Sequence, residues 1–190
     1  MKNEKPASGE TNLRPAGPGD KQLVFSWRND PEIIVLGTSR RSVTWEEHSG
    51  WFDKVLDQTR HLLFIIETMD GTPAGTVRLD RLAEDNAEIA IYLLNPFTGK
   101  GLGTRAIQIA SARAFEHWPP LTRIEALVRT ENQRSLKAFS RAGFHSDGEK
   151  PEGLDGHVLF LLDRSPDTQE NLSQTGAGPV GSTANAERPS

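Results

Sequence analysis

The sequence predicts an α+β fold in which helices flank a mixed β-sheet, and three observations point to it. Hydrophobic residues recur with helical spacing up to residue 55, with strand spacing from 61 to 94, and with each spacing in turn afterwards. Turn residues such as Asp70-Gly71 and helix breakers such as Pro119-Pro120 separate these segments. The predicted order of elements is β α α β β β α β α β β.

Two helices are predicted before the central strands. Asp20 is a candidate N-cap for a helix over residues 21–28, which stops near Asn29-Asp30-Pro31. Thr44 and Glu47 have the spacing of a capping box, so a second helix should begin there and run through Val55.

Strands and helices then alternate along the chain. Residues 61–68 and 73–80 read as a hairpin joined by Asp70-Gly71, and 87–94 adds a third strand. The remaining predicted elements are a helix at 101–118, a strand at 123–128, a helix at 132–142, and strands at 144–149 and 157–163.

Length and composition favour one globular domain. A chain of 190 residues can bury one proper core. We expect the folded domain to span 12–164, between a flexible N-terminus at 1–11 and a disordered, polar tail at 165–190.

Charge and residue usage argue against several classes of function. A net charge of −4 lacks the basic footprint of a nucleic-acid binder. The absence of cysteine leaves no disulfide framework and no thiolate nucleophile. Since no stretch resembles a signal peptide or a membrane span, we expect a cytoplasmic protein that engages no membrane.

The stretch NPFTGKGLGTR, residues 95–105, places three glycines where a strand meets a helix. A nucleotide phosphate loop needs lysine after its last glycine, whereas Lys100 precedes Gly101. The dinucleotide pattern G-x-G-x-x-G fails because Gly103 comes one residue early. A plain turn explains one or two glycines, so we expect the amides at this helix N-terminus to hold a pyrophosphate.

Two motifs resemble the GNAT superfamily of acyl-CoA N-acyltransferases. Residues 98–103 resemble its motif A, [Q/R]-x-x-G-x-[G/A], except that Thr98 stands where the family has Gln or Arg. Residues 132–144, from Asn-Gln-Arg-Ser to Ala-Gly-Phe, resemble its N-x-x-[AS]…G-F segment. The nearest subgroups are the amino-sugar-nucleotide and the ribosomal-protein N-terminal acetyltransferases. The resemblance covers 12–164 and implies a mostly antiparallel sheet of about seven strands with about four helices.

The resemblance implies acetyl-CoA as co-substrate. The loop amides would hold its pyrophosphate, with Lys100 or Arg105 as candidates to compensate for Thr98. Strand residues would pair with the pantetheine arm, and Asn132, which is also a helix N-cap candidate, would hydrogen-bond it with Ser135. The full expected set is Leu93, Leu94, Gly99, Lys100, Gly101, Leu102, Gly103, Thr104, Asn132 and Ser135.

Direct transfer to a primary amine, without a metal or a covalent intermediate, is the expected reaction. Glu88 is the candidate base, because a carboxylate beside hydrophobic residues has a raised pKa; the alternative is a solvated strand-end glutamate. The family's usual acid, a tyrosine, is replaced by Phe139. Tyr92 lies on the same strand face as Glu88 by period two and is the substitute candidate, with Ser140 or water as alternatives.

The acceptor is expected to contact polar and aromatic residues of the first two predicted helices. Their pattern, WRN and H-x-x-W, resembles enzymes that acetylate nucleotide-linked amino sugars, and also those acting on protein N-termini or aminoglycosides. Packing onto the sheet is the alternative role for the two tryptophans. The candidates are Trp27, Arg28, Asn29, His48 and Trp51.

A different class of function stays open as the rival. The departures at Thr98 and Phe139 fit a non-catalytic acyl-CoA-binding module. A homodimer is compatible with the family, although no interface is visible in the sequence.

Overall fold

The computed structural model describes residues 11–37, 40–57, 59–146 and 155–165. The expected flexible N-terminus and polar tail therefore lie almost entirely outside the described residues, as does the end of the strand predicted at 144–149. What was expected of these segments stays a prediction.

A sheet of seven strands in the order β1-β2-β3-β4-β5-β7-β6 forms the centre of the fold. Neighbouring strands are antiparallel except β4 and β5, which are parallel. This arrangement confirms the predicted mixed, mostly antiparallel sheet. The strands are β1 (Asn12–Pro15), β2 (His61–Glu67), β3 (Pro73–Arg81), β4 (Asn86–Leu93), β5 (Arg123–Arg129), β6 (His145–Ser146) and β7 (His157–Asp163).

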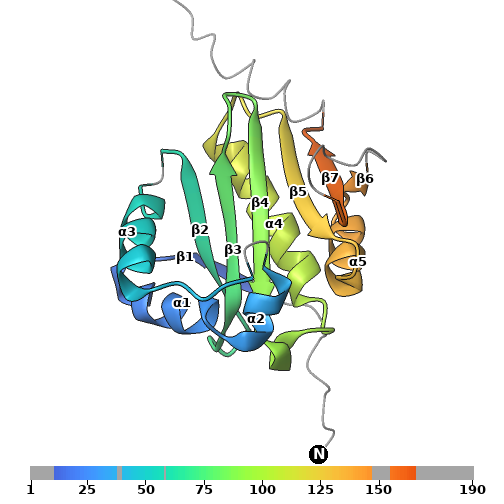
Figure 1. Ribbon diagram of the computed structural model, residues 1–190. Helices are drawn as coiled ribbons and strands as arrows, with labels where there is room; N and C mark the ends of the chain where they lie inside the picture. Colours follow the sequence, from blue (N-terminus) through green and yellow to red (C-terminus); the bar gives the residue numbers. More distant parts are fainter. Residues whose placement is uncertain (1–10, 38–39, 58, 147–154, 166–190) are drawn as a thin grey trace, which may run out of the picture.

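Within the described ranges, five α-helices cover the two faces of the sheet. Helices α1 to α3 lie on one face, and α4 and α5 lie on the other (Figure 1). Their bounds are α1 (Lys21–Arg28), α2 (Pro31–Leu36), α3 (Trp45–Val55), α4 (Leu102–His117) and α5 (Gln133–Arg141).

Helix α2 is absent from the sequence prediction, which interpreted Asp30-Pro31 only as a stop. The Asp30 side chain accepts a hydrogen bond from the Glu32 amide at 2.8 Å, and Pro31 occupies the first helical position. The same two residues that end α1 therefore start a new helix, as an N-cap followed by proline does.

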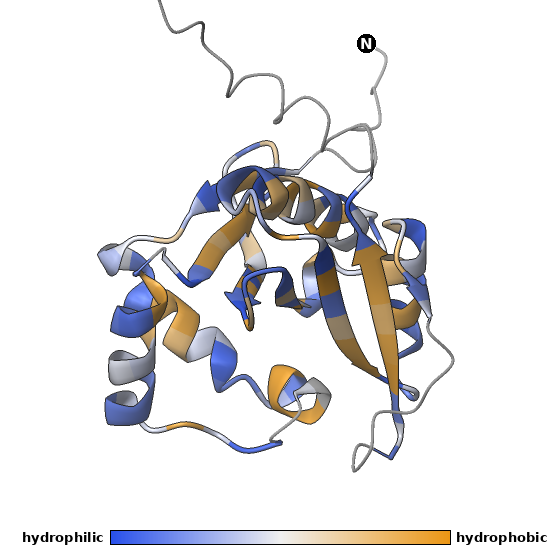
Figure 2. Cartoon of the chain, turned by 90° about the horizontal axis from the view of Figure 1, so that it is seen from above, coloured by the Kyte–Doolittle hydropathy of each residue, from blue (hydrophilic) through white to orange (hydrophobic). Residues whose placement is uncertain are grey.

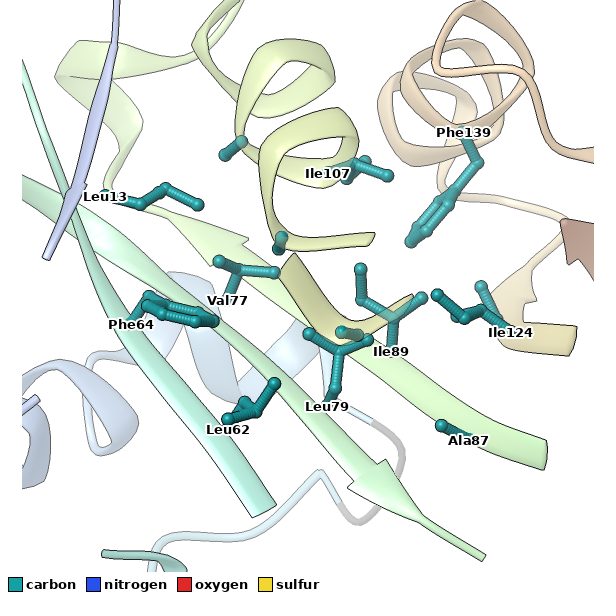
Figure 3. Close-up of a cluster of buried hydrophobic side chains, with 14 of the residues drawn as sticks. Leu13, Leu62, Phe64, Val77, Leu79, Ala87, Ile89, Ile107, Ile124 and Phe139 are labelled. Carbon is teal, nitrogen blue, oxygen red and sulfur yellow. The ribbon is translucent and has the colours of Figure 1, made fainter. Parts of the chain in front are cut away.

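The larger core lies between the sheet and helices α4 and α5 (Figure 3). Alternate strand residues such as Val77, Leu79 and Ile89 point into it, and Ile107 of α4 is fully buried there. Phe139 of α5 is only 2% exposed and packs edge-on against Phe144. The residue that replaces the family's tyrosine is thus part of the core.

A second, smaller core joins α1 and α3 to the other sheet face. Val24 and Phe52 meet Leu63 and Ile65 of β2 there, since odd-numbered residues of β2 face this side. Hydrophobic residues accordingly concentrate in the strands and the inner sides of the helices (Figure 2).

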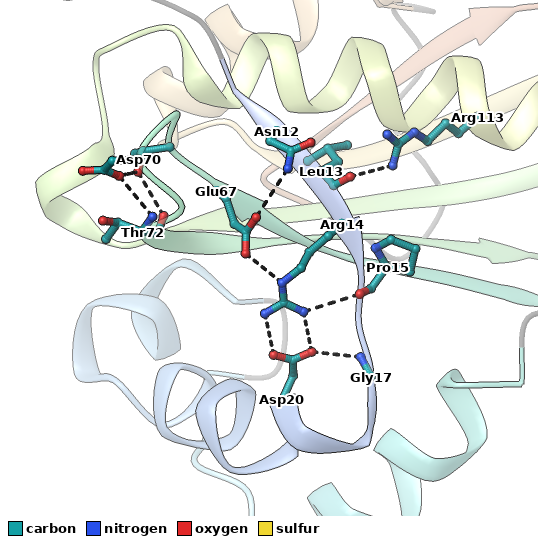
Figure 4. A network of polar contacts seen from close by, with 11 residues as sticks. Asn12, Leu13, Arg14, Pro15, Gly17, Asp20, Glu67, Asp70, Thr72 and Arg113 are labelled. Carbon is teal, nitrogen blue, oxygen red and sulfur yellow. Dashed lines mark hydrogen bonds and ion pairs between the residues drawn. The ribbon is translucent and has the colours of Figure 1, made fainter.

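A polar network attaches the N-terminal strand to the sheet and to the start of α1 (Figure 4). The Arg14 guanidinium donates to both Asp20 carboxylate oxygens at 2.7 Å and to Glu67 at 2.7 Å. Asp20 also accepts from the Gly17 amide at 2.8 Å, and its side chain makes no capping bond to α1. Asp20 is the N-cap residue of α1, as predicted, but its carboxylate is engaged by Arg14 and not by the helix amides, and the hydrogen bond from Arg14 lowers its pKa.

The capping box at the start of α3 is confirmed. The Glu47 amide donates to the Thr44 hydroxyl at 3.2 Å, and the Thr44 amide donates to the Glu47 carboxylate at 2.9 Å. Across the described ranges, no helix has both the length and the hydrophobicity needed to cross a bilayer.

Candidate active site

The parallel pair β4 and β5 separates shortly after it begins. Pairing is confined to Asn86–Glu88 of β4 against Arg123–Glu125 of β5. Beyond Glu88 the two strands diverge, and α4 lies behind the opening (Figure 1). Because β5 stays paired with β7 along its whole length, the divergence leaves an unpaired strand edge on β4.

The end of β4 offers the backbone of Leu93, and not that of Leu94, to this opening. The Leu94 amide donates to the Ala74 carbonyl at 2.9 Å, and the Leu94 carbonyl accepts from Phe97 at 2.9 Å. Since successive residues direct their backbone groups to opposite edges, those of Leu93 point toward β5. The expectation that Leu94 pairs with a pantetheine arm is corrected, because its backbone groups are already used.

The glycines after β4 each have a separate structural reason. Gly99 and Gly101 adopt positive φ angles of 74° and 86°, which other residues adopt only at a cost. Gly103 lies against Leu93: a Cβ added to it would be 3.3 Å from the Leu93 Cδ1 atom. The loop therefore packs its backbone closely against the end of β4.

The N-terminus of α4 has no protein cap. Gly101 is the N-cap residue and provides no side chain, and the first turn contains no acidic residue. The first amides of a 16-residue helix thus stay open to an anion at the positive end of the helix dipole.

Basic side chains from two helices surround this loop. Lys100 and Arg105 are exposed, with the Lys100 ammonium 5.8 Å from the centre of the Phe97 ring. Arg134 of α5 donates a hydrogen bond to the Thr98 hydroxyl at 3.3 Å. Sequence reasoning missed Arg134, although it lies inside the second quoted motif, because nothing in the sequence brings that motif next to the first.

Asn132 caps α5. Its side-chain oxygen accepts a hydrogen bond from the Ser135 amide at 3.1 Å. The helix-capping role that the sequence left open is therefore present, and both residues lie half-buried at the start of α5.

Glu88 lies where β4 and β5 part, half-buried, in line with Asp80 of β3 and Glu125 of β5. Burial raises the pKa of Glu88, Asp80 and Glu125 raise it further, and the positive charge of Arg78 opposes the rise. Asp80 is engaged by His61 and Arg78, each at 2.8 Å. Within the described ranges Glu88 itself has no hydrogen bond or ion pair, so its carboxylate is available to a ligand.

Tyr92 comes four residues after Glu88 on β4. Because side chains alternate between the faces of a strand, the two lie on the same face of the sheet. Its hydroxyl is buried and has no hydrogen-bond partner among the described residues. Burial raises the pKa of Tyr92 to about 12, against the opposing influence of Thr76, Arg28 and Arg78. The hydroxyl therefore keeps its proton at neutral pH and can donate it.

Two of the residues expected to contact the acceptor are packing residues. His48 is 2% exposed, and its Nε2 atom lies 2.9 Å from the Lys21 carbonyl. Trp27 is 8% exposed, and its ring meets that of Tyr92 edge-on at 6.5 Å. Both side chains are withdrawn from solvent and pack beneath α1 and α3, so their expected contact with an acceptor stays a prediction.

The other three expected residues contact the segment after α2 or a side chain of β3. Asn29 exchanges two hydrogen bonds with the backbone of Val43, at 3.0 and 2.8 Å. Arg28 donates to the Arg41 carbonyl at 3.3 Å. Trp51 is half-buried under the Arg78 guanidinium, 5.3 Å from the ring centre, and so supports the residue that lies beside Glu88.

An open hollow lies beside the end of β4, between α2 and the turn after the strand. Its walls are Asp30, Pro31, Glu32, Asn95 and Pro96. Glu88 and Tyr92 are not among its lining residues, so this hollow is separate from the reacting groups.

A comparison with known families identifies the family of the chain. The family described as "Acetyltransferase (GNAT) domain" matches residues 11–145. The chain belongs to the GNAT acetyltransferase family. It is an acetyl-CoA-dependent N-acetyltransferase, as the two sequence motifs indicated.

The chain is similar to one characterised acetyltransferase in sequence and to two solved acetyltransferase structures in fold. It is 27% identical over 146 residues to the spermidine N(1)-acetyltransferase of Escherichia coli (strain K12), covering 76% of this chain and 77% of that protein. A Vibrio cholerae spermidine N-acetyltransferase in complex with CoA and spermine superposes with a TM-score of 0.69 at 20% identity, over 80% of this chain and 95% of that one. The aminoglycoside acetyltransferase AAC(6')-Ib in complex with coenzyme A gives a TM-score of 0.67 at 21% identity, over 88% and 100% of the two chains.

These structural likenesses confirm the GNAT fold. Membership of the family confirms acetyl-CoA as co-substrate. The nucleotide-linked amino sugar suggested by the sequence finds no support among these relatives.

Proposed function

We propose that this GNAT enzyme acetylates a primary amino group of a polycationic amine, with a linear polyamine as the first choice. The observation that carries the proposal is the row of three carboxylates, Asp80, Glu88 and Glu125, in register across β3, β4 and β5. The relatives named for spermidine support the same class.

The negative charge of these three carboxylates is complementary to a substrate that carries several ammonium groups. Asp80 already binds His61 and Arg78, whereas Glu125 accepts only a neutral donor, the Asn86 side-chain amide at 2.7 Å. In the part of the chain that the structure describes, Glu88 and Glu125 have no ion pair with a basic side chain. A substrate with one reacting and one anchoring ammonium would neutralise both.

Glu88 is the proposed base. An amine must lose a proton before or as it attacks the thioester carbonyl, and the attacking nitrogen forms the new C–N bond while the C–S bond breaks. A half-buried carboxylate with a raised pKa and no partner can take that proton, directly or through one water.

Tyr92 is the proposed acid, in place of the tyrosine that Phe139 replaces. Its hydroxyl is protonated at neutral pH and has no partner among the described residues, so it is free to protonate the leaving thiolate. The open amides at the start of α4 and the backbone edge of Leu93 are the proposed contacts of the pyrophosphate and the pantetheine arm.

The test is thiol release from acetyl-CoA with linear polyamines, an aminoglycoside and an N-terminal peptide as acceptors. We expect turnover with polyamines, a fall in kcat of about 100-fold for Glu88→Gln, and a smaller fall for Tyr92→Phe. Glu125→Gln should raise the KM for the polyamine with little change in kcat, because it anchors and does not react.

Other outcomes separate the alternatives. An unchanged rate for Glu88→Gln would remove it as the base. Selective turnover of the N-terminal peptide would show that the acceptor is a protein N-terminus and not a polyamine. CoA binding without turnover on any amine would favour the non-catalytic binding module.

A further inference from the structure

Arg134 stands next to the one position where the glycine loop departs from its family. Thr98 is too short to reach a phosphate as Gln or Arg would. The structure brings the Arg134 guanidinium to that position from α5, by the hydrogen bond of 3.3 Å to the Thr98 hydroxyl. The Thr98 hydroxyl in turn donates to the Asn95 carbonyl at 2.9 Å, which fixes its place in the turn.

The charge around Arg134 is unbalanced. It lies in the first turn of α5, where the positive end of the helix dipole disfavours a cation. Its hydrogen bond to Thr98 ties it to the loop that carries Lys100 and leads into the uncapped, positive end of α4, whose first turn contains Arg105. Among the described residues no carboxylate forms an ion pair with any of these three basic side chains. Two positive helix ends and three cations at one loop call for a polyvalent anion.

The position of Arg134 also matters because it lies across the opening. Thr98 follows β4, whereas Arg134 follows β5, and the two strands diverge between them. A guanidinium reaching from the β5 side can bind two phosphate oxygens at once while the α4 amides bind others.

We propose that Arg134 binds the pyrophosphate of acetyl-CoA and replaces the side chain that the family carries at the position of Thr98. The contact would then link the two sides of the β4–β5 opening through the bound co-substrate. This proposal concerns the donor half of the site and does not depend on which amine is the acceptor.

The experiment measures equilibrium binding of CoA to the full chain by calorimetry, without any acceptor. Arg134→Ala should weaken CoA binding about tenfold, which corresponds to about 1.4 kcal/mol. Arg141→Ala, at the exposed end of the same helix, is the matched control and should leave the affinity unchanged.

Truncated ligands identify the phosphate. 3′-Dephospho-CoA retains the pyrophosphate, so Arg134→Ala should weaken its binding by the same factor as for CoA. Pantetheine lacks the pyrophosphate, so its affinity should not change. Loss of the effect with 3′-dephospho-CoA would assign the contact to the 3′-phosphate and overturn the proposal, as would equal losses for CoA and pantetheine.

A transplant gives the most specific test. In Arg134→Ala, the added substitution Thr98→Arg restores a family residue at the loop and should recover most of the lost CoA affinity. The Thr98→Arg single variant reports any effect of the new side chain alone. Unchanged CoA binding in Arg134→Ala would show that Arg134 takes no part in CoA binding. If the affinity falls in Arg134→Ala and Thr98→Arg does not restore it, Arg134 does not replace the family side chain at position 98, which also overturns the proposal.

Discussion

The two ends of α4 are built in opposite ways. At the C-terminal end, the buried Arg164 guanidinium donates to the carbonyls of Leu121, Phe115 and Trp118 at 2.7, 2.5 and 3.1 Å. At the N-terminal end, Gly101 provides no capping side chain, and no acidic residue balances the helix dipole. The chain therefore caps the C-terminal end with a buried cation and leaves open the end that we propose receives the pyrophosphate.

The difference shows how function is obtained at some cost in stability. A cation at a helix C-terminus and an acid or a capping hydroxyl at the N-terminus both stabilise a helix. This protein uses the first device on α4 and omits the second, although it uses the second fully at Thr44 on α3. The omission on α4 keeps its amides free for phosphate.

Removing the Arg164 side chain that caps the C-terminal end of α4 should have the largest effect on stability. Arg164→Ala removes the donor of three carbonyls at a buried position. We expect the free energy of unfolding to fall by about 3 kcal/mol. Urea denaturation measures this change. The CoA dissociation constant of the folded protein should stay the same, and a parallel loss of CoA affinity would show that the two ends are coupled.

Placing a negative charge at the N-terminal end of α4 should stabilise the helix and weaken the binding of CoA. Thr104→Glu puts a carboxylate in the first turn of α4, which should add about 0.5 kcal/mol to stability and weaken CoA binding about tenfold by repulsion. Thr104→Gln has the same shape without the charge and is the control. If both variants bind CoA equally well, the first turn does not face the phosphates.

The glycines of the open end should behave unlike other glycines. Gly99→Ala meets no atom within 4 Å, yet its φ of 74° should cost about 1 kcal/mol of stability. Gly50→Ala, on the exposed side of α3, also meets no atom and should stabilise by about 0.5–1 kcal/mol. Thermal unfolding of both variants measures the contrast, and equal signs would contradict it.

The smallest expected effect is on the pH dependence of stability and concerns Glu88. Like the start of α4, Glu88 has no partner among the described residues, and its half-buried position then lowers stability. Because burial raises the pKa of Glu88 in the folded state, the folded protein holds this proton at pH values where the unfolded chain has lost it. Stability should therefore decline as pH rises from the ordinary glutamate pKa of 4.5 through the raised pKa. Glu88→Gln should remove this decline, so that the variant is the more stable protein at pH 8 and gains nothing at pH 4.

Urea titrations of the wild type and Glu88→Gln at a series of pH values measure this difference. A stability difference independent of pH would mean that Glu88 titrates alike in both states. The comparison is independent of catalysis, so it tests the buried environment of the carboxylate separately from its proposed role as the base.

The sequence by itself determined the local elements and the chemistry of the main loop. Hydrophobic periodicity predicted the central strands, period two placed Glu88 and Tyr92 on one face, and the glycines indicated an anion-binding helix end. These features are encoded in neighbouring residues, and local interactions suffice to specify them. Even the missed helix α2 carries a local signal in Asp30-Pro31.

Only the tertiary structure decided which residues meet. Strand register aligned Asp80 and Glu125 with Glu88, and a backbone bond to Ala74 withdrew Leu94 from the opening. Packing buried His48 and Trp27, which the sequence offered as acceptor contacts, and brought Arg134 to Thr98 across the opening. Register and burial depend on pairing between residues far apart in the chain, which is settled by the packing of the whole domain and not by any one segment.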